Sequence, residues 1–364
     1  MIVTGIVVEY NPLHNGHLKH IEQARKITNC DVLIAVMSGN FVQRGEPAII
    51  DKFQRTQMAL DHGVDIVIEI PFPLVIQNAS IFAESAVQLL NLAQCDYIVF
   101  GSELNDLEML QTYADLNINV NNLREIMQDG TSYPKAHSLL SQSFFPNDIL
   151  GVAYLKALKN TSITPMIIPR NNEGFPLAIQ SASSIRKRIF NQEDARDFTP
   201  TTFDHTVHFM HDFFPLIKQN LLTANASSLK NIALFAEGIE NNLIKQAANN
   251  YDYEHFIQHC VSRRYTRARI NRTLLFMLTN IKQETLDELP ALNELRVLGF
   301  NQVGRQVIKH LVLDEVKVVT KFKHWNKQYR ELELKSTALY ISTLDASEQE
   351  YLWNREFKGP IIID

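Results

Sequence analysis

Short apolar runs alternate with amphipathic stretches along roughly the first 190 residues of the chain. The runs are rich in β-branched residues, a composition typical of strands that are covered on both faces. They are Ile2–Val8, Asp31–Met37, Asp65–Ile70, Asp96–Phe100 and Met166–Ile168. Residues 51–61 and 80–92 repeat apolar positions with the period of a helix. The alternation predicts an α/β fold with a Rossmann-like, doubly wound parallel sheet, whose ligands bind beyond the carboxyl ends of the strands.

The pattern changes between residues 194 and 205, where acids and threonines surround Pro200. Beyond this stretch the helical period dominates, and only four of the 13 glycines occur there. The candidate helices are Phe209–Leu222, Glu240–Asn249, Thr273–Ile281 and Gly304–Leu313. We therefore expect a parallel-sheet domain over residues 1–195 and a mainly helical domain over residues 205–364.

Composition and charge narrow the class of protein. With 364 residues and 45% hydrophobic content, the chain can bury a core in each of two domains. A formal net charge of −5 is no global nucleic-acid signature, so any RNA contact has to come from a local patch. Cys30, Cys95 and Cys260 are scattered, which suits reduced thiols and not a disulfide framework or a zinc finger. The chain opens on a strand without a signal-peptide pattern, and no uncharged apolar run reaches about 18 residues. We expect a cytoplasmic protein that does not contact a membrane.

Two histidines follow the first predicted strand, where it meets a helix. His14, Gly16 and His17 come after Asn11-Pro12 and before an apolar helical stripe. A helix N-terminus attracts anions through its dipole and its unpaired N–H groups, and two imidazoles can donate hydrogen bonds to a phosphate as charge develops on it. The glycine lets a nucleotide approach the backbone. Two other interpretations stay open at this point: surface histidines that cap the helix, and a zinc pair, although neither a His-Glu-x-x-His helix nor a cysteine cluster accompanies them.

Later polar segments extend this chemistry. The loop after the second strand contains two glycines and Arg44, which could bind a phosphate or an acid substrate, and Gly101 ends the fourth strand. Residues 181–186, with the sequence SASSIR, precede a helix expected over residues 185–190, and hydroxyls beside a helix N-terminus suit a phosphate. Each feature also has an ordinary structural interpretation, as a solvated arginine, a turn glycine or a serine helix cap.

At these residues the chain resembles the nucleotidyltransferases that carry a His-x-Gly-His signature. The longer string GIVVEYNPLHNGHLKHI, with SGNFVQRGEPAI and SASSIRKRI, is similar to one family, the bacterial tRNA(Met) cytidine acetate ligases. The resemblance extends over most of the chain. It implies an enzyme that activates acetate with ATP as acetyl-adenylate. The acetyl group then passes to N4 of the wobble cytidine, position 34, of elongator tRNA(Met), which becomes N4-acetylcytidine.

The resemblance also implies which residues bind ATP. His14 and His17 would be the catalytic pair, and Ser184 stands where the superfamily usually has threonine. The implied ATP contacts are Val7, Val8, Glu9, Tyr10, Asn11, Pro12, Leu13, His14, Asn15, Gly16, His17, Leu18, Lys19, His20, Gly101, Asn147, Arg170, Ser183, Ser184 and Arg186. Mg²⁺ is expected to accompany ATP, but the sequence does not name a protein ligand for it.

One basic segment in the second half of the chain is a candidate for contact with tRNA. Residues 262–273, SRRYTRARINRT, contain five arginines and no acid: Arg263, Arg264, Arg267, Arg269 and Arg272. Arginines can neutralise phosphates, and the ring of Tyr265 could stack on a base. A solvated helix that pairs with acids elsewhere is the alternative. A weaker basic group around Trp325 could extend the surface.

Two other functions stay open. A small-molecule adenylyltransferase of the pantetheine-phosphate or nicotinate mononucleotide type would share the histidines but is usually much shorter. A non-catalytic RNA-binding protein with a vestigial nucleotide fold would not need the histidine and serine motifs intact. A class I synthetase is disfavoured because the sequence lacks a Lys-Met-Ser-Lys-Ser-like loop. The sequence identifies no protein partner.

Overall fold

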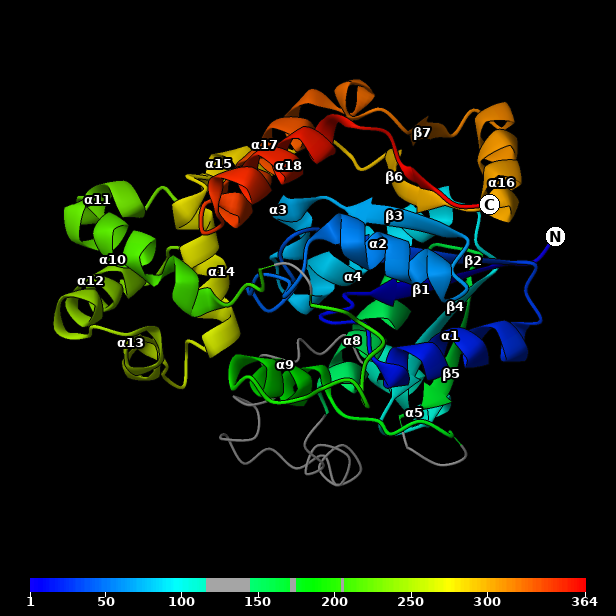
Figure 1. Ribbon diagram of the computed structural model, residues 1–364, viewed down its shortest axis with the longest axis horizontal. Coiled ribbons are helices and arrows are strands. Elements are labelled where there is room, and N and C mark those ends of the chain that lie inside the picture. The colour runs from blue at the N-terminus through cyan, green and yellow to red at the C-terminus, as the bar shows by residue number, and fades with distance from the viewer. Residues whose placement is uncertain (116–144, 171–174, 204–205) are drawn as a thin grey trace.

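The computed structural model describes residues 1–115, 145–170, 175–203 and 206–364. At its centre is one sheet with the strand order β5-β4-β1-β2-β3-β6-β7, and β8 pairs with β6 (Figure 1). The strands are β1 Val3–Val8, β2 Val32–Ser38, β3 Ile66–Ile70, β4 Tyr97–Ser102, β5 Thr164–Pro169, β6 Glu294–Phe300, β7 Lys317–Val319 and β8 Ile361–Ile362. Strands β1 to β5 run parallel, so the α/β class predicted from the apolar runs is confirmed.

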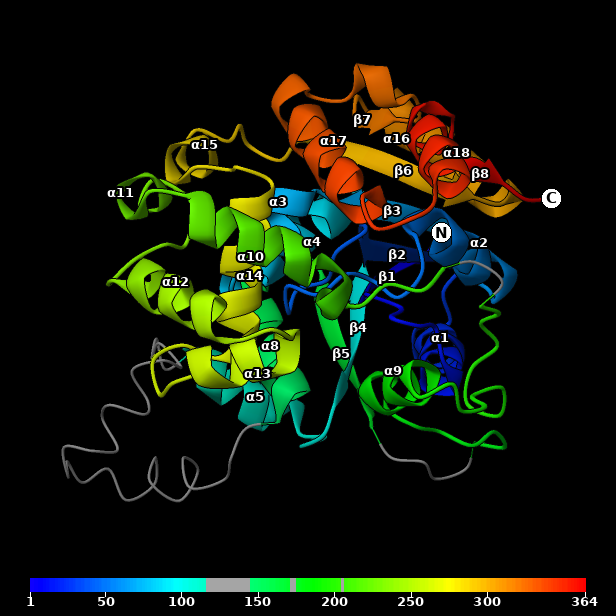
Figure 2. The same cartoon turned by 60° about the vertical axis from the view of Figure 1, so that its left-hand side comes forward.

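Helices cover both faces of this sheet (Figures 1 and 2). In the first half of the chain they are α1 Asn15–Thr28, α2 Lys52–Asp61, α3 Phe72–Val75, α4 Ala79–Leu92, α5 Leu107–Asp115, α8 Pro146–Leu158 and α9 Ala182–Phe190. On one face, Ile21 of α1 and Leu60 of α2 join a buried core with side chains of the strands. On the other face, Leu90 of α4 and Leu155 of α8 do the same. Within the described residues, no helix is long and apolar enough to cross a membrane.

Strand β1 is the point at which the chain changes direction across the sheet. It pairs with β2 on one side and with β4 on the other. The loops after β1 and β4 therefore leave the sheet in opposite directions, and in open sheets of this kind the ligand crevice is expected between two such loops, at the carboxyl ends of the strands. The predicted histidine motif follows β1, and Gly101 lies near the end of β4.

The second half of the chain contributes a helical group and also completes the sheet. Its helices are α10 Phe214–Thr223, α11 Ala226–Leu229, α12 Ile239–Asn249, α13 Tyr253–Cys260, α14 Arg267–Leu278, α15 Gln283–Asp287, α16 Gln302–Leu313, α17 Lys327–Ile341 and α18 Ala346–Phe357, with 3₁₀ turns η1 Met210–Phe213 and η2 Phe322–His324. Helices α10 to α15 gather beyond the carboxyl ends of β1 and β2 (Figure 1). The four helices expected in this half are present.

Strand β6 was not predicted, although it lies antiparallel to β3 and is buried at all seven positions. The reason is local: Glu294 and Arg296 interrupt its apolar pattern, and both are buried in ion pairs. The chain after the expected boundary near residues 195–205 thus supplies β6, β7 and β8 to the common sheet. Residue 205, the expected first residue of the second domain, lies outside the described residues.

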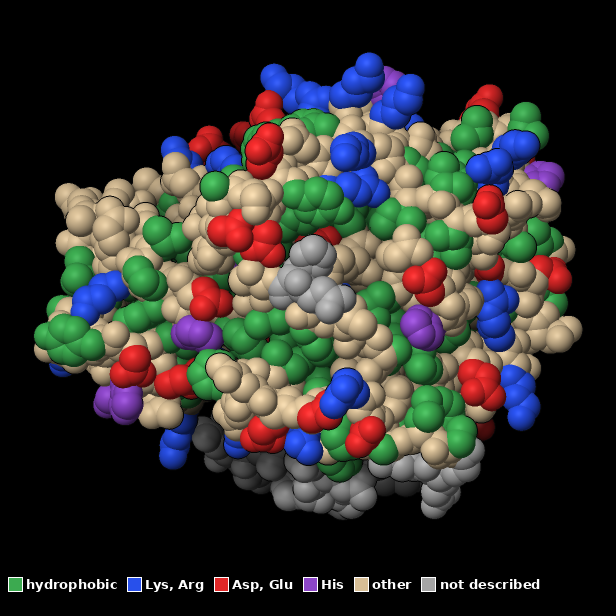
Figure 3. Space-filling model, viewed as in Figure 1, with side chains coloured by type: hydrophobic (Ala, Val, Ile, Leu, Met, Phe, Trp, Pro, Cys, Tyr) green, Lys and Arg blue, Asp and Glu red, His purple; other side chains and the backbone are tan. Residues whose placement is uncertain are grey.

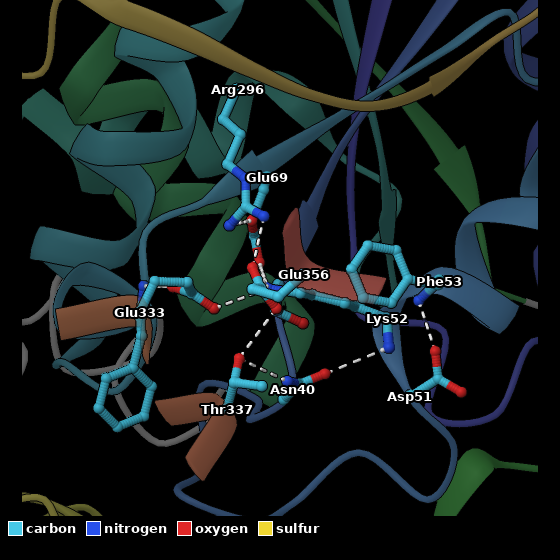
Figure 4. Close-up of polar contacts among 12 residues, drawn as sticks. Asn40, Asp51, Lys52, Phe53, Glu69, Arg296, Glu333, Thr337 and Glu356 are labelled. Carbon is cyan, nitrogen blue, oxygen red and sulfur yellow. Dashed lines mark hydrogen bonds and ion pairs between the residues drawn. The ribbon is translucent and has the colours of Figure 1, made fainter. Parts of the chain in front are cut away.

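A buried cluster of charges joins the two halves of the chain (Figure 4). Lys52, the first residue of α2, places its Nζ 2.8 Å from Glu69 of β3, 3.0 Å from Glu333 of α17 and 2.9 Å from Glu356 of α18. Arg296 of β6 pairs with Glu69 and Glu356. The side chains of the lysine and of all three glutamates are 0% exposed. Removing one partner from such a cluster leaves an uncompensated buried charge, which is strongly destabilising.

We predict that Lys52→Met will lower the free energy of unfolding by about 3–5 kcal/mol, because Glu333 and Glu356 would lose their lysine partner while they stay buried and Arg296 would be the one cation left in the cluster. Urea denaturation followed by circular dichroism measures this. Lys327→Met is the matched control, since Lys327 is exposed and its contact with Glu331 is 3.8 Å long. A loss as small as that of the control would show that Lys52 does not stabilise the cluster.

The contribution of the cluster to the free energy of unfolding should also depend on pH, because the cluster contains three acids and two bases. Burial raises the pKa of Glu69 to about 8, although Arg296 and Lys52 oppose this. The folded state therefore binds a proton that the unfolded state releases near pH 4.5, so this contribution to stability is lost as the pH rises from about 4.5 to about 8.

Glu69→Gln mimics the protonated acid and should remove that part of the pH dependence. Unfolding free energies of the wild-type protein and the variant, measured side by side between pH 5 and pH 9, should show the variant gaining stability relative to the wild-type protein as the pH rises. A difference that stays constant over this range would contradict a raised pKa at Glu69.

Candidate active site

The side chains of the two histidines of the motif both cap the start of α1. His14 is the N-cap residue, and its Nδ1 accepts a hydrogen bond from the backbone N–H of Gly16 at 3.0 Å. The Nδ1 of His17 accepts from the backbone N–H of His14 at 3.2 Å. The rings stack, with centroids 3.8 Å apart. Both Nδ1 atoms are acceptors, so this network assigns the proton of each neutral ring to Nε2, the nitrogen that the cap does not use.

Both histidines are neutral near pH 7. Burial lowers the pKa of His14 to about 4, and the positive charges of Arg170 and Arg186 act in the same direction. Burial also lowers the pKa of His17 well below its ordinary value. The pair therefore offers two uncharged donors, while the arginines supply the positive charge that would attract a phosphate.

Gly16 is required by the cap itself. A Cβ at this position would lie 2.9 Å from Cε1 and 3.0 Å from Nδ1 of the His14 ring. From the sequence, we expected this glycine to let a nucleotide approach the backbone closely. The structure adds that any side chain here would push away the ring that caps the helix.

Other members of the segment 7–20 hold the surrounding loops. The side chain of Asn15 donates to the carbonyls of Ala178 and Asp197, each at 2.8 Å. The Oδ1 of Asn11 accepts from the N–H of Ile49 at 2.8 Å. These amides are buried and already engaged, so their direct role is to position the loops around the histidines.

The rest of this segment divides between strand, packing and site. Val7 and Val8 are the last residues of β1, and Leu18 packs against the core under α1. Tyr10 has a left-handed backbone (φ 49°) and packs edge-on against His17, with ring centroids 5.0 Å apart. The peptide bond before Pro12 is cis. The other residues of the segment contact neighbouring loops and strands. Glu9 accepts from the N–H of Gln43, and the carbonyl of Leu13 accepts from Thr199 and Thr201. On α1, the Nε2 of His20 lies 3.0 Å from the carbonyl of Val99, and Lys19 precedes it.

Helix α9 brings the serine-arginine motif to this loop. It begins at Ala182, three residues before the predicted start, and the hydroxyl of Ser181 caps it by accepting from the N–H of Ser184 at 3.2 Å. Ser183 and Ser184 therefore lie in the first turn. The guanidinium of Arg186 donates to the carbonyl of Asn11 at 2.7 Å and lies 3.4 Å from the hydroxyl of Ser183.

A third group lies across the crevice, at the ends of β4 and β5. A Cβ on Gly101 would lie 2.9 Å from Cγ of Arg170, so the missing side chain lets Arg170 lie against β4. Asn147, in the first turn of α8, donates to Oε1 of Glu103, and Nε of Arg170 lies 3.6 Å from the same oxygen. The structure thus places Gly101, Asn147 and Arg170 together, around an acid that sequence reasoning did not select.

Sequence reasoning also missed Arg55, which is fully buried under the site. Its guanidinium donates to the carbonyl of Glu9 at 2.6 Å, to that of Ser38 at 3.1 Å, and to that of Gly39. It therefore ties the loop after β1 to the loop after β2. A signal existed in the sequence, because Arg55 lies among the apolar positions of the predicted helix over residues 51–61, where an arginine has to find several acceptors.

The arginine segment lies against the loop after β2. Gly45 of that loop has φ +73°, and a Cβ there would lie 2.5 Å from the backbone nitrogen of Arg272. The guanidinium of Arg272 donates to the carbonyl of Gln43 at 3.3 Å. The segment is not one helix, since α14 begins only at Arg267. Although distant in sequence from the histidines, the segment borders a loop that surrounds the site.

The side chains of the segment differ in exposure. Arg263, Arg264 and Arg267 are exposed, and Arg267 forms a two-pronged pair with Glu254 at 2.8 and 2.6 Å. The expectation that Tyr265 offers a stacking surface is wrong. Its side chain is buried, its hydroxyl donates to the carbonyl of Ala236 at 2.9 Å, and Arg269 lies over its ring.

Known proteins resemble this chain along its whole length. Residues 1–355 match the family described as HIGH Nucleotidyl Transferase. The tRNA(Met) cytidine acetate ligase of Oceanobacillus iheyensis is 35% identical and covers 99% of both chains, and that of Staphylococcus aureus strain JH9 is 37% identical and covers 98% of both. The crystal structure of Thermotoga maritima TmcAL bound with alpha-thio ATP matches with a TM-score of 0.85 and 30% identity over 100% of both chains.

These likenesses confirm the family that the motifs indicated. A second Thermotoga maritima TmcAL structure, without ligand, has a TM-score of 0.87 and 29% identity over the same coverage. Identity above 30% over nearly the full length, together with the matching fold, places the chain: it belongs to the tRNA(Met) cytidine acetate ligases, a family of HIGH nucleotidyl transferases.

Proposed function

We propose that this protein activates acetate with ATP and acetylates N4 of the wobble cytidine, position 34, of elongator tRNA(Met). The observation that carries the ATP half is the position of the neutral His14–His17 pair at the start of α1, with Arg186 and Arg170 beside it. The related ligases and the bound alpha-thio ATP of the Thermotoga maritima protein support the same substrate class. The protein would act in the cytoplasm, where its tRNA substrate is found.

In the first step, a carboxylate oxygen of acetate attacks the α-phosphorus of ATP. The new P–O bond gives acetyl-adenylate, and the bond to the leaving pyrophosphate breaks. Both Nε2–H groups can donate to the oxygens on which charge develops, and the arginine cations stabilise the same charge. Because burial lowers the pKa of both histidines, they act as neutral hydrogen-bond donors, and the positive charge at the site comes from the arginines.

In the second step, the N4 amine of the cytidine attacks the acetyl carbonyl. The amine loses a proton, the C–O bond to AMP breaks, and N4-acetylcytidine forms. No covalent enzyme intermediate is needed in either step. A buried, water-poor crevice would protect the mixed anhydride from hydrolysis.

Mg²⁺ is proposed to arrive with ATP and not to occupy a site of its own. Among the described residues, no group of three or more histidine, cysteine, aspartate or glutamate side chains could hold a metal ion. Mg²⁺ commonly keeps several waters and binds through the phosphates of its nucleotide. We assign it no protein ligand and derive no step through it.

The tRNA is proposed to contact the exposed part of the arginine segment. Arg263, Arg264 and Arg267 lie at the start of α14 or just before it, and Asn271 and Arg272, one turn further along the helix, contact Gly45 in the loop after β2. A tRNA whose backbone lies on these residues could place an anticodon base in the crevice. Arg269 and Arg272 would support the surface, because one covers Tyr265 and the other holds the loop after β2.

Nucleoside analysis tests the whole proposal. Purified protein, tRNA, ATP and labelled acetate should yield labelled N4-acetylcytidine in elongator tRNA(Met), detected by mass spectrometry. Release of pyrophosphate with pantetheine phosphate or nicotinate mononucleotide as acceptor, and no acetylated tRNA, would favour the small-molecule adenylyltransferase instead.

Replacing His14 or His17 with alanine should lower acetate-dependent exchange of labelled pyrophosphate into ATP by about a hundredfold or more, because each ring donates to charge that exists only in the transition state. His310→Ala is the control, since His310 is exposed on α16, at the opposite end of the strands. Near-normal exchange in both active-site variants would remove the histidines from the chemistry.

Replacing Arg263, Arg264 and Arg267 together with alanine should weaken tRNA binding and flatten its salt dependence, by about one unit of slope for each phosphate that the protein no longer neutralises. Filter binding over a salt series measures both quantities. ATP affinity should hardly change, because Arg272, which holds the active-site loop, is left in place.

A second triple variant removes the same amount of charge from the basic group around Trp325, the possible extension of the surface. Its residues, Lys321, Lys323 and Lys327, lie where basic side chains gather over η2 and the start of α17 (Figure 3). Loss of tRNA affinity in the lysine triple would extend the surface to this group. Normal tRNA binding by the arginine triple over the salt series would contradict the role of the arginines, and loss of ATP affinity in that variant would show that they support the active site.

A further inference from the structure

Glu103 follows β4 at the edge of the sheet where a nucleotide is expected, and one of its oxygens has no hydrogen-bond partner in the described part of the chain. Glu103 is the first residue after β4, the strand next to β1 at the point where the chain changes direction. Its Oε1 accepts from Asn147 and faces Arg170. Its Oε2 is buried and has no hydrogen-bond partner among the described residues. A buried carboxylate oxygen without a donor is costly, so its presence requires an explanation.

The backbone around Glu103 is held firmly, so its position is not an accident of a loose loop. Asp148, in the first turn of α8, accepts from the hydroxyl of Ser102 at 2.6 Å and from the N–H of Glu103 at 3.1 Å. The hydroxyl of Ser102 accepts in turn from the N–H of Asn105 at 2.9 Å. Asp148 is 2% exposed. Two successive residues of α8 thus hold Glu103. Asp148 accepts from the backbone N–H of Glu103, and Asn147 donates to its carboxylate.

The chemistry of ATP limits what the unpaired oxygen can bind. A carboxylate repels phosphates, so Oε2 has to face a donor. ATP carries donors in two places, the two hydroxyls of the ribose and the 6-amino group of adenine. Glu103 contacts Arg170, and the charge of Arg170 acts directly on His14 and His17. This puts Glu103 near the phosphate end of the nucleotide, and the ribose is the part attached to the α-phosphate.

We propose that Glu103 is a specificity-determining residue that accepts a hydrogen bond from a ribose hydroxyl of ATP. In nucleotide-binding sheets an acid near the same crevice has this role for dinucleotides. The acid would let the site select ribonucleotides over deoxyribonucleotides. A site built to pair with a hydroxyl discriminates strongly against an analogue that lacks it, because its own polar group is then left unpaired. The inference rests on the ATP binding proposed above and is independent of acetate and tRNA.

Calorimetric titration with ATP, 2′-deoxy-ATP and 3′-deoxy-ATP, without acetate or tRNA, tests the assignment. The wild-type protein should bind ATP about tenfold or more tightly than at least one deoxy analogue, a ratio expected for a hydrogen bond to a charged group. Glu103→Ala should bring the affinity for ATP down to that for the deoxy analogue and leave the latter almost unchanged. Glu108→Ala, an exposed glutamate on α5, is the matched control and should keep the wild-type ratio.

Three results would overturn the proposal. Equal affinity of the wild-type protein for ATP and both deoxy analogues would do so without any variant. An equal loss for all three nucleotides in Glu103→Ala would show that the acid only positions Asn147 and Arg170. A preference for ATP over purine riboside triphosphate that disappears in the variant, with the ribose preference intact, would assign the oxygen to the adenine amino group.

Two additions keep the test decisive. Glu103→Gln preserves the shape of the side chain, and it should show a smaller loss in the same direction if Glu103→Ala does not fold. Acetate-dependent pyrophosphate exchange is measured separately on the wild-type protein. If ATP binds with the expected ribose preference but no exchange occurs, the ligase function fails and the assignment of Glu103 stands.

Discussion

Where parallel strands end, the backbone groups that follow lose their partners in the sheet, and the active site is built from the side chains that replace those partners. Arg55 donates to the carbonyls of Glu9 and Ser38. Asp148 accepts from the N–H of Glu103, and His14 accepts from the N–H of Gly16. Each of these bonds fixes a loop that borders the crevice. Because the same side chains satisfy the backbone and shape the site, a change to any of them alters loop geometry before it alters chemistry.

The first half of the fold could be predicted from the sequence because its signals are local. Five apolar runs became the five parallel strands, and the His-x-Gly-His spacing located a helix start. The family followed from the same residues. By contrast, β6 was not predicted, because Glu294 and Arg296 lie inside it and their partners come from other elements of the chain. A pattern of hydrophobic and polar positions cannot show that Arg296 is paired with an acid 60 residues away.

The candidate site shows the same division. The histidines, the serine-arginine motif and Gly101 come from the sequence. The structure joins the second of these to the histidine loop through Arg186 and Asn11, and places Gly101 against Arg170. Glu103 carries no local signature, because its partner Asn147 comes from another segment. For Arg55 the local pattern indicates burial but not its partners, which are carbonyls of other segments. The prediction that Tyr265 stacks on a base was wrong for the opposite reason. An aromatic residue among arginines resembles a stacking surface, but its burial depends on Ala236 and Arg269, which no pattern near it reveals.

The arginine segment is less separate from the site than its distance in sequence suggests. Asn271 and Arg272 seat Gly45, so α14 and the loop after β2 are in contact through their backbones. A displacement of α14 on contact with RNA would therefore reach the loop that Arg55 anchors. The surface is thus linked to this loop by packing, and Glu46 of the same loop pairs with Arg186 of the site at 3.3 Å.

The charge cluster has a consequence for how this protein is made. Lys52 emerges from the ribosome early, whereas Glu333 and Glu356 are synthesised 281 and 304 residues later. Until they arrive, the first half of the sheet has a lysine without two of its three acids and an open edge at β3, where β6 will pair. The charge cluster and the pairing of β3 are therefore completed only after these later segments have been synthesised, and until then the open strand edge exposes the nascent chain to aggregation.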